Sequence, residues 1–261
     1  MASDGSSPWF PYPAGPATER SPLLFCLHHG GAGASAYRDW QRLLGTDVEV
    51  VPVQLPGREA RLAEPVERSI AALTERLAGP VVERAGGRPF AFFGHSMGAL
   101  LAYDLSFALT ADGQPPVHLA VSGCAPPHLR AATSVHTLSD DEFLAHVTAL
   151  EGTPAEILDN PTLLELVLPV LRDDFAACET YTYTERGPLD APIAIFAGES
   201  DPGVPPAGMA RWADLTSGGA SVDVFPGSHF YLHERLTELL AALRTRLLLF
   251  PVGSADGGGA P

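Results

Sequence analysis

Residues 90–101 read Phe90-Ala91-Phe92-Phe93-Gly94-His95-Ser96-Met97-Gly98-Ala99-Leu100-Leu101. The apolar, aromatic-rich beginning predicts a buried strand, and the spacing and composition of residues 99–109 predict a helix. Between them lies a G-x-S-x-G motif, which is typical of a sharp strand-to-helix turn that exposes its serine. Glycine is needed at both ends of the motif, because a Cβ atom would clash where strand and helix nearly touch. We therefore predict that Ser96 is an exposed nucleophile.

Composition narrows the class of protein. The chain has 261 residues, a formal net charge of −15 at pH 7, 46% apolar residues and no lysine. The length suits one large α/β domain with an insertion, and the absence of lysine excludes Schiff-base and P-loop chemistry. Because no apolar run is long enough to span a bilayer and no secretory signal is recognisable, we expect a soluble, cytoplasmic protein. So acidic a surface repels nucleic acid and anionic membranes, which we exclude as partners.

Predicted strands and helices alternate along most of the chain. Strands are predicted at residues 22–28, 47–53, 90–93, 117–124, 191–198 and 220–225, and helices at 35–44, 66–84, 99–109, 206–215 and 231–249. This alternation predicts an α/β fold with a mostly parallel sheet and helices on both faces. The predicted organisation is an irregular N-terminal arm (1–21), a core (22–124 and 190–249), a helical insertion (125–189) and a disordered tail (250–261).

The alternation breaks within residues 125–189, where only helices are predicted. One begins after Ser139, one lies near 154–158 and one spans 162–180. An insertion that follows a strand at the ligand-binding edge of an open sheet is well placed to act as a lid. Its apolar side chains would line an acyl pocket or pack against the core: Phe143, Leu144, Val147, Leu150, Ile157, Leu163, Leu166, Val167, Leu171 and Phe175.

A glycine-rich loop follows the first predicted strand. Residues 31–36 fit G-x-G-x-x-A, the dinucleotide fingerprint, but that fold requires an acid at the end of the next strand, where this sequence has Gln54. The alternative is that the loop presents a backbone N–H, that of Gly30, to a negatively charged oxygen beside Ser96. We favour this second interpretation, which requires no cofactor.

The order of polar residues after the strands indicates a catalytic triad. Ser96, Asp201 and His229 each follow a predicted strand, and Ser-Asp-His is the chain order of α/β-hydrolases. In such a triad the imidazole takes the serine proton and the carboxylate orients the imidazole. The backbone N–H groups of Met97 and Gly30 would form the oxyanion hole. The expected reaction is acyl transfer to serine followed by hydrolysis, and the residues alone leave ester, amide and thioester substrates open.

Other candidates for these roles are less well placed. The rival bases are His28, His29, His95, His118, His128, His136, His146 and His233, and the rival acids are Glu199, Asp190 and Asp223. None combines the post-strand position with the chain order as well. His229 and His233 are spaced to share a metal ion, but no third ligand is evident, so we expect no metal. The cysteines, Cys26, Cys124 and Cys178, are expected to be reduced thiols.

Five motifs resemble those of type II thioesterases of polyketide and nonribosomal peptide synthesis, and the likeness spans Trp9 to Leu248. They are Cys26-Leu27-His28-His29-Gly30-Gly31-Ala32-Gly33-Ala34-Ser35, Leu55-Pro56-Gly57-Arg58-Glu59-x-Arg61-x-x-Glu64-Pro65, Gly94-His95-Ser96-Met97-Gly98-Ala99, Leu171-Arg172-x-Asp174-Phe175-x-x-x-Glu179-x-Tyr181 and Gly227-x-His229-Phe230. His28 stands where the family pattern has proline, and a proline-rich segment, residues 202–205, follows the predicted acid.

The resemblance implies an α/β-hydrolase fold and a cofactor-free editing enzyme. Such an enzyme hydrolyses aberrant short acyl groups from the phosphopantetheine arm of acyl or peptidyl carrier proteins. A general carboxylesterase or lipase, a product-releasing thioesterase and a non-catalytic binding protein remain alternatives.

Carrier proteins are usually acidic, so this acidic chain should dock them weakly and transiently unless arginines gather near the pocket mouth. The candidates are Arg58, Arg61, Arg130 and Arg172, although the loop that carries the first two, residues 55–65, is more simply interpreted as solvated.

Overall fold

A single parallel sheet forms the centre of the protein. The computed structural model describes residues 7–13, 15, 21–150 and 160–249. The described strands are β1 (Leu23–Leu27), β2 (Glu49–Pro52), β3 (Phe90–His95), β4 (His118–Ser122), β5 (Ile193–Gly198) and β6 (Ala220–Phe225). They pair in the order β2-β1-β3-β4-β5-β6, and every neighbouring pair is parallel. The predicted α/β class is confirmed.

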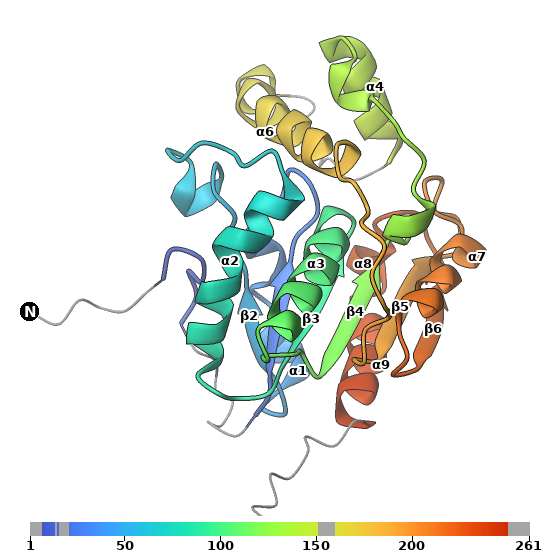
Figure 1. Cartoon of the computed structure of the whole chain (residues 1–261). Helices are drawn as coiled ribbons and strands as arrows, with labels where there is room; N and C mark the ends of the chain where they lie inside the picture. Colours follow the sequence, from blue (N-terminus) through green and yellow to red (C-terminus); the bar gives the residue numbers. More distant parts are fainter. Residues whose placement is uncertain (1–6, 14, 16–20, 151–159, 250–261) are drawn as a thin grey trace, which may run out of the picture.

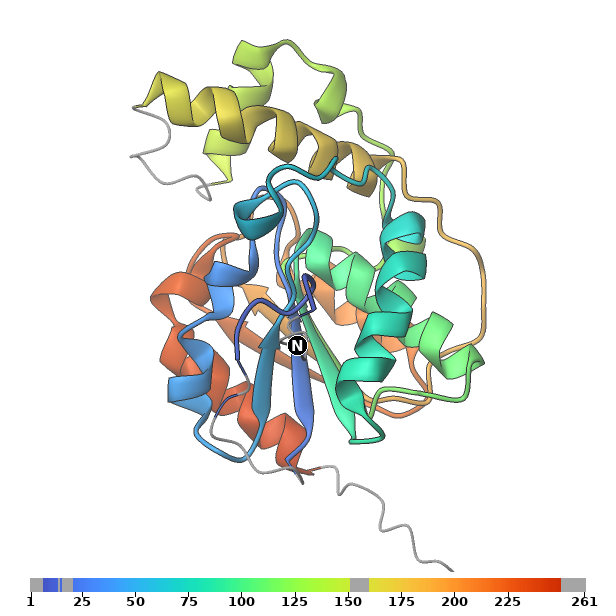
Figure 2. The ribbon, with the colours of Figure 1, turned by 90° about the vertical axis from the view of Figure 1, so that its left-hand side faces the viewer.

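Helices cover both faces of the sheet, so the core has three layers (Figures 1 and 2). On one face lie α2 (Ile70–Ala85) and α3 (Met97–Ala111), and on the other α1 (Trp40–Leu44), α8 (Tyr231–Glu234) and α9 (Leu236–Leu249). Every residue of β1 to β5 is buried, as two covered faces require, whereas the edge strand β6 alternates between exposed and less exposed positions. Within the described ranges, no helix is both long and apolar enough to cross a membrane.

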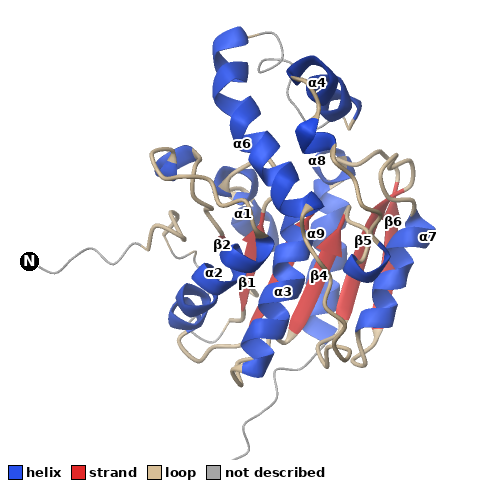
Figure 3. Ribbon diagram, turned by 45° about the horizontal axis from the view of Figure 1, so that its top comes forward, coloured by secondary structure: helices blue, strands red, loops and turns tan. Residues whose placement is uncertain are grey.

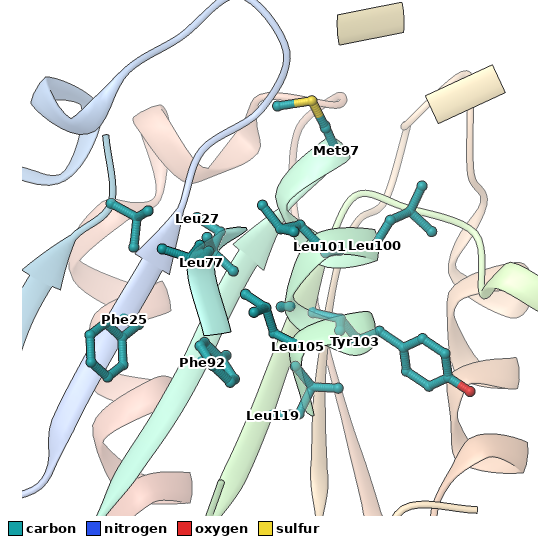
Figure 4. Packing of buried hydrophobic residues seen from close by; sticks show 14 of the residues in the cluster. Phe25, Leu27, Leu77, Phe92, Met97, Leu100, Leu101, Tyr103, Leu105 and Leu119 are labelled. Carbon is teal, nitrogen blue, oxygen red and sulfur yellow. The ribbon is translucent and has the colours of Figure 1, made fainter. Parts of the chain in front are cut away.

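The larger hydrophobic cluster fills the space between the sheet and helices α2 and α3. Figure 4 shows Phe25 and Phe92 from the sheet packed near Leu77 of α2 and Leu105 of α3, and all of these side chains are fully buried. Burial of each such side chain contributes about 1.5–3 kcal/mol to stability. The apolar stripe of α2 is buried in this cluster and consists of Ile70, Leu73, Leu77 and Val81. This packing fixes β3 and α3, and therefore the turn between them.

The insertion lies across the carboxyl ends of the strands (Figures 1 and 3). Its described helices are η3 (Pro127–Leu129), η4 (Val135–Thr137), α4 (Asp140–Ala149) and α6 (Pro161–Glu179). A capping box formed by Ser139 and Glu142 begins α4, as the sequence predicts. The helix predicted near residues 154–158 lies outside the described residues.

One predicted helix begins later in the structure and three others are divided. Helix α2 begins at Ile70 rather than at residue 66, because the Ser69 hydroxyl accepts the Ala72 N–H and caps the helix there. The helices predicted at 35–44, 206–215 and 231–249 are each divided. The first comprises η1 (Ala34–Tyr37) and α1, the second α7 (Pro206–Met209) and η5 (Ala210–Leu215), and the third α8 and α9. In the third, Arg235 has φ −112° and ψ 28°, which is not helical geometry.

The N-terminal arm is fastened to the core next to the loop that follows β2. Trp9 and Phe10 are buried, and the Gln54 N–H donates to the Trp9 carbonyl at 2.8 Å. The Arg61 guanidinium carbon lies 4.1 Å from the centroid of the Trp9 ring, within cation–π range. A short 3₁₀ helix, η2 (Glu59–Arg61), lies in the same loop.

Candidate active site

Ser96 occupies the tight turn between β3 and α3. Its φ of 53° lies in the left-handed region and its ψ is −117°, a combination that non-glycine residues rarely adopt. The Ser96 N–H donates to the Ser122 carbonyl of β4 at 2.8 Å, which holds the turn against the sheet. Backbone strain of this kind is maintained only where the surroundings enforce it, and it concentrates at functional sites.

The two glycines of the motif are required by close backbone contacts. A Cβ atom on Gly94 would lie 2.1 Å from the carbonyl oxygen of Gly98, and one on Gly98 would lie 2.1 Å from that of Leu27. Both distances are far inside van der Waals contact, and backbone atoms cannot move aside as a flexible side chain can. The predicted reason for glycine at these positions is confirmed.

A Gly98→Ala substitution is therefore expected to destabilise the whole fold. The added methyl group would push α3 away from β1, and we expect the free energy of unfolding to fall by about 3 kcal/mol or more. Urea denaturation followed by circular dichroism measures this change. Gly208→Ala is the matched control, because a Cβ atom there would meet nothing nearer than Val204 Cγ1 at 3.7 Å. Equal stability of the two variants would contradict the prediction.

Asp201 and His229 meet at the carboxyl end of the sheet, after β5 and β6. The His229 Nδ1 and Asp201 Oδ2 atoms are 2.8 Å apart, and only 7% and 1% of the two side chains are exposed. The other carboxylate oxygen, Oδ1, accepts the N–H groups of Gly203 at 2.8 Å and Val204 at 3.2 Å. The proline-rich segment that departs from the family pattern thus supplies the donors that hold the carboxylate in place.

Ser96 and His229 line the same cavity, which has a volume of about 320 Å³. Gly30 and Met97 line it as well, so four of the five residues expected to take part in catalysis border one space. The fifth, Asp201, is bonded to His229. Among the described residues, no hydrogen bond joins Ser96 to His229. Catalytic hydrogen bonds in unliganded sites are often long and tighten when substrate binds.

Two further histidines, His29 and His95, lie close to His229. The His95 ring lies 4.9 Å from the His229 ring between centroids, and its Nδ1 is 2.9 Å from Ser122 Oγ, which contacts the Tyr231 hydroxyl at 2.7 Å. Burial is the main cause that lowers the pKa of His29 to about 3, and it lowers the pKa of His95 well below the usual range. Both rings are therefore neutral near pH 7. Of the three imidazoles, that of His229 is the one paired with Asp201.

The rival acids have other environments. Asp190 accepts a hydrogen bond from Ser217 Oγ at 2.9 Å, and Asp223 pairs with Arg246 at 3.0 Å. Glu199 is exposed at the end of β5. Of the acids considered in the sequence, Asp201 is the one bonded to His229.

The glycine-rich loop after β1 is arranged for packing rather than for a dinucleotide. The residue at the end of β2, Gln54, is buried, and its side-chain oxygen accepts the Ala34 N–H at 3.1 Å. Its amide group donates to the carbonyls of Leu55 and Arg58 at 3.2 Å each. An uncharged side chain therefore stands where the dinucleotide fingerprint requires an acid.

The expectation of a solvated loop with free arginines is wrong for Arg58 and Arg61. Both are only 6% exposed. Arg58 forms a bidentate ion pair with Asp174 of α6, and Arg61 pairs with Glu64 at 2.6 Å. Burial of a guanidinium requires such partners, and a polar sequence does not reveal whether distant segments supply them. Neither arginine is available to an external partner.

The two remaining arginines lie in the insertion, in different settings. Arg130 lines the cavity, where its Nη1 lies 3.2 Å from Cys124 Sγ. Arg172 donates to the carbonyls of His136 and Leu138 at 2.7 Å each and pairs with the exposed Asp140. The condition set for tighter docking, a gathering of these arginines near the pocket mouth, is therefore not met.

The apolar residues of the insertion divide between several environments. Phe143, Val147 and Leu171 form a small hydrophobic cluster of their own, while Leu150 and Phe175 line the cavity. Leu163 and Leu166 are 40% and 55% exposed. Ile157 lies outside the described residues. Both expectations, packing and pocket lining, thus hold for different residues.

The cysteines carry no disulfide and there is no sign of a metal centre in the described part of the chain. Cys26 and Cys124 are buried free thiols, and Cys178 is partly buried. No group of three or more potential metal ligands occurs among the described residues.

The parallel sheet, the serine turn and the acid–imidazole pair together define an α/β-hydrolase fold. The family model for a thioesterase domain matches residues 22–247. The chain therefore belongs to the thioesterase family.

Individual relatives agree over nearly the whole chain. RedJ, a thioesterase from the prodiginine biosynthetic pathway in Streptomyces coelicolor, is 40% identical, with 90% of this chain and 89% of that one covered and a TM-score of 0.83. The type II thioesterase BorB from the borrelidin biosynthetic cluster is 36% identical, with 89% and 95% covered and a TM-score of 0.82. A protein of Brevibacillus parabrevis named linear gramicidin dehydrogenase LgrE is 39% identical over 90% of this chain and 91% of its own length. The resemblance drawn from the sequence motifs is confirmed.

Proposed function

We propose that the protein is a serine thioesterase that hydrolyses aberrant short acyl groups from the phosphopantetheine arm of carrier proteins in a polyketide or nonribosomal peptide synthase. The observation that carries the proposal is the meeting of the strained Ser96 turn with the Asp201–His229 pair at one cavity. Membership of the thioesterase family supports the reaction, and the biosynthetic clusters named for RedJ and BorB support the setting.

In the acylation step, Ser96 Oγ attacks the thioester carbonyl carbon while His229 Nε2 takes the hydroxyl proton. Asp201 holds Nδ1–H toward itself and stabilises the imidazolium that forms, without taking the proton. The negative oxygen of the tetrahedral intermediate accepts the backbone N–H groups of Met97 and Gly30. When the intermediate collapses, the C–S bond breaks, the pantetheine thiol leaves with the proton from His229, and the acyl group remains on Ser96.

In the deacylation step, water replaces the thiol and His229 again acts as base. The water oxygen bonds to the acyl carbon, the C–O bond to Ser96 breaks, and the proton held by His229 returns to the serine oxygen. A carboxylic acid and free enzyme result. Each proton passes through the one imidazole that is paired with a carboxylate, while His29 and His95 stay neutral beside it.

The two hollows beside Gly30 suit a thioester attached to a long arm. Gly30 borders both the cavity that contains Ser96 and a groove of about 480 Å³. The groove runs between the loop after β1, the loop that contains η2, and α6, and apolar side chains such as Leu166 and Val170 line it. A carbonyl held at Gly30 would direct a short acyl group into the cavity and the pantetheine along the groove. In this arrangement the insertion serves as a lid over both.

Charge sets the strength of carrier docking. A protein with a net charge of −15 repels an acidic carrier at long range, and the internal pairing of Arg58 and Arg61 leaves them unable to offset this repulsion. We therefore propose weak, transient docking in which the arm rather than the protein surface supplies specificity. The cytoplasmic location expected from the sequence stays a prediction.

The test is a comparison of substrates for the wild-type enzyme. We expect kcat/KM for a propionyl-carrier thioester to exceed that for a nitrophenyl ester of the same acyl group by about tenfold or more, because binding of the arm positions the carbonyl. Release of free acid, followed by mass spectrometry of the carrier, measures the reaction. The reverse preference would indicate a carboxylesterase, and preference for a full-length product over propionyl would indicate a releasing enzyme. No turnover of either would indicate a binding protein.

A further inference from the structure

The helical insertion reaches directly into the loop proposed to stabilise the oxyanion. Asp174 of α6 is 1% exposed, and its Oδ2 accepts the Gly31 N–H at 2.7 Å. The same carboxylate binds Arg58 through both oxygens, with Nη1–Oδ2 at 2.5 Å and Nη2–Oδ1 at 2.9 Å. Arg58 is anchored in turn by the Pro56 carbonyl at 3.1 Å. One buried carboxylate therefore connects three segments: α6, the loop after β1 and the loop after β2.

The packing between α6 and the glycine loop is close. A Cβ atom on Gly30 would lie 3.3 Å from Asp174 Cβ, and one on Gly31 would lie 2.8 Å from Leu171 Cδ1. Gly31 also has a φ of 78°, which favours glycine. The loop thus lies against one turn of α6, at the position of Leu171 and Asp174.

The loop is held at both ends by other contacts, since the His29 carbonyl accepts the Ala32 N–H at 3.2 Å and the Ala34 N–H donates to Gln54 at 3.1 Å. Glycines have the widest conformational freedom of all residues, and Gly30, Gly31 and Gly33 carry no side chains that could anchor it. Oxyanion stabilisation requires donors whose direction is set before the reaction. The hydrogen bond from Gly31 N–H to Asp174 fixes the peptide plane that follows Gly30, and Arg58 Nη1 also donates to the Ala32 carbonyl at 3.4 Å. Asp174 and Arg58 therefore hold the part of the loop that directly follows Gly30.

We propose that Asp174, held by Arg58, is a positioning residue that aligns the Gly30 N–H for the oxyanion only while α6 is seated on the loop. Closure of the insertion and assembly of the oxyanion hole are then one event. Displacement of α6 would withdraw Asp174 from the Gly31 N–H and leave the peptide after Gly30 without that hydrogen bond. The inference rests on the proposed function, since it assigns these residues a part in the serine thioesterase reaction.

The test compares Asp174→Asn and Arg58→Lys with Asp173→Asn. Asp173 is the adjacent residue on the same helix and pairs with Arg68 at 3.1 Å, but this pair is partly exposed and does not touch the glycine loop. We expect the first two variants to lose about 10- to 100-fold in kcat with little change in KM, because complete loss of an oxyanion donor costs about 10²–10³-fold. The Asp173→Asn variant should stay within about twofold of wild type.

A second measurement separates positioning from simple stabilisation. A trifluoromethyl ketone analogue of propionyl-pantetheine adds to the active serine and places its oxyanion in the same hole. Its inhibition constant should rise in Asp174→Asn by the same factor by which kcat/KM falls, since both report transition-state stabilisation. A thioether analogue that lacks the carbonyl should bind with unchanged affinity. If Asp174→Asn does not fold, Arg58→Lys, which keeps the charge but not the two-pronged geometry, provides the same comparison.

Two results would overturn the inference. One is a lower melting temperature of the Asp174 and Arg58 variants with unchanged kcat and inhibitor affinity, which would make the pair purely structural. The other is an effect on KM alone. Failure of the proposed function is distinguishable from both, because the wild-type protein and the Ser96→Ala variant would then release the acyl group at the same rate.

Discussion

Replacing Ser96 by alanine is expected to lower kcat for hydrolysis of a propionyl-carrier thioester by on the order of 10⁵–10⁶-fold. The nucleophile is lost, while the Asp201–His229 pair and the backbone donors at Gly30 and Met97 stay in place. Those groups alone retain some stabilisation of direct attack by water, so the residual rate should remain above the uncatalysed rate. Single-turnover assays with radiolabelled propionyl carrier provide the sensitivity that this range requires.

Mass spectrometry adds a direct sign of the covalent step. Rapidly quenched wild-type enzyme should carry one propionyl group on the peptide that contains Ser96, and the alanine variant should carry none. Ser106→Ala is the matched control, because Ser106 is a buried serine of α3, the helix that follows Ser96, and its hydroxyl donates to the Ala102 carbonyl at 2.7 Å. Its activity should remain within about threefold of wild type. Retention of more than about 1% of activity by Ser96→Ala would exclude Ser96 as the nucleophile.

Replacing Asp201 by asparagine is expected to lower kcat by about 10⁴-fold, because the substitution fixes the wrong tautomer of His229. The side-chain oxygen of asparagine would remain on the N–H groups of Gly203 and Val204, which now bind Oδ1. Its amide nitrogen would then face His229 Nδ1 and donate to it. The ring would have to carry its proton on Nε2, where it must instead accept the serine proton.

The control for this prediction is Glu199→Gln, which changes a carboxylate two residues away. Glu199 is exposed and outside the pair with His229, so its neutral variant should retain activity within about twofold. Steady-state assays and thermal melts of both variants complete the comparison. Loss of activity in Glu199→Gln with near-normal rates in Asp201→Asn would reverse the assignment of the acid.

Much of the sheet and the polar residues at its edge could be predicted from the sequence, because these features are encoded locally. The continuous apolar runs predict buried strands, and β6 coincides with its predicted range, residues 220–225. The glycine spacing around Ser96 follows from contacts between adjacent elements, so it is visible within one short motif. The positions of Asp201 and His229 follow from parallel topology, which brings the ends of separate strands to one edge.

Helix divisions were less predictable, because they depend on single residues. Apolar spacing runs without interruption from residue 231 to 249, yet the structure interrupts the helix at Arg235. The start of α2 was predicted too early, because residues 66–68 suit a helix in composition. The side chain of Ser69 caps the helix and determines where it begins. Propensity summed over a segment does not resolve such breaks.

The sequence by itself determined the sheet, the serine turn and the order of the candidate triad, because each depends on spacing within a few residues or on strand order. Only the tertiary structure showed that the arginines of the polar loop after β2 are buried. Arg58 and Asp174 are separated by 116 positions in the chain, and neither residue reveals from its neighbours that it is buried. A buried ion pair exists only where packing brings two distant segments into register, and here that packing places the insertion on the loop that faces Ser96.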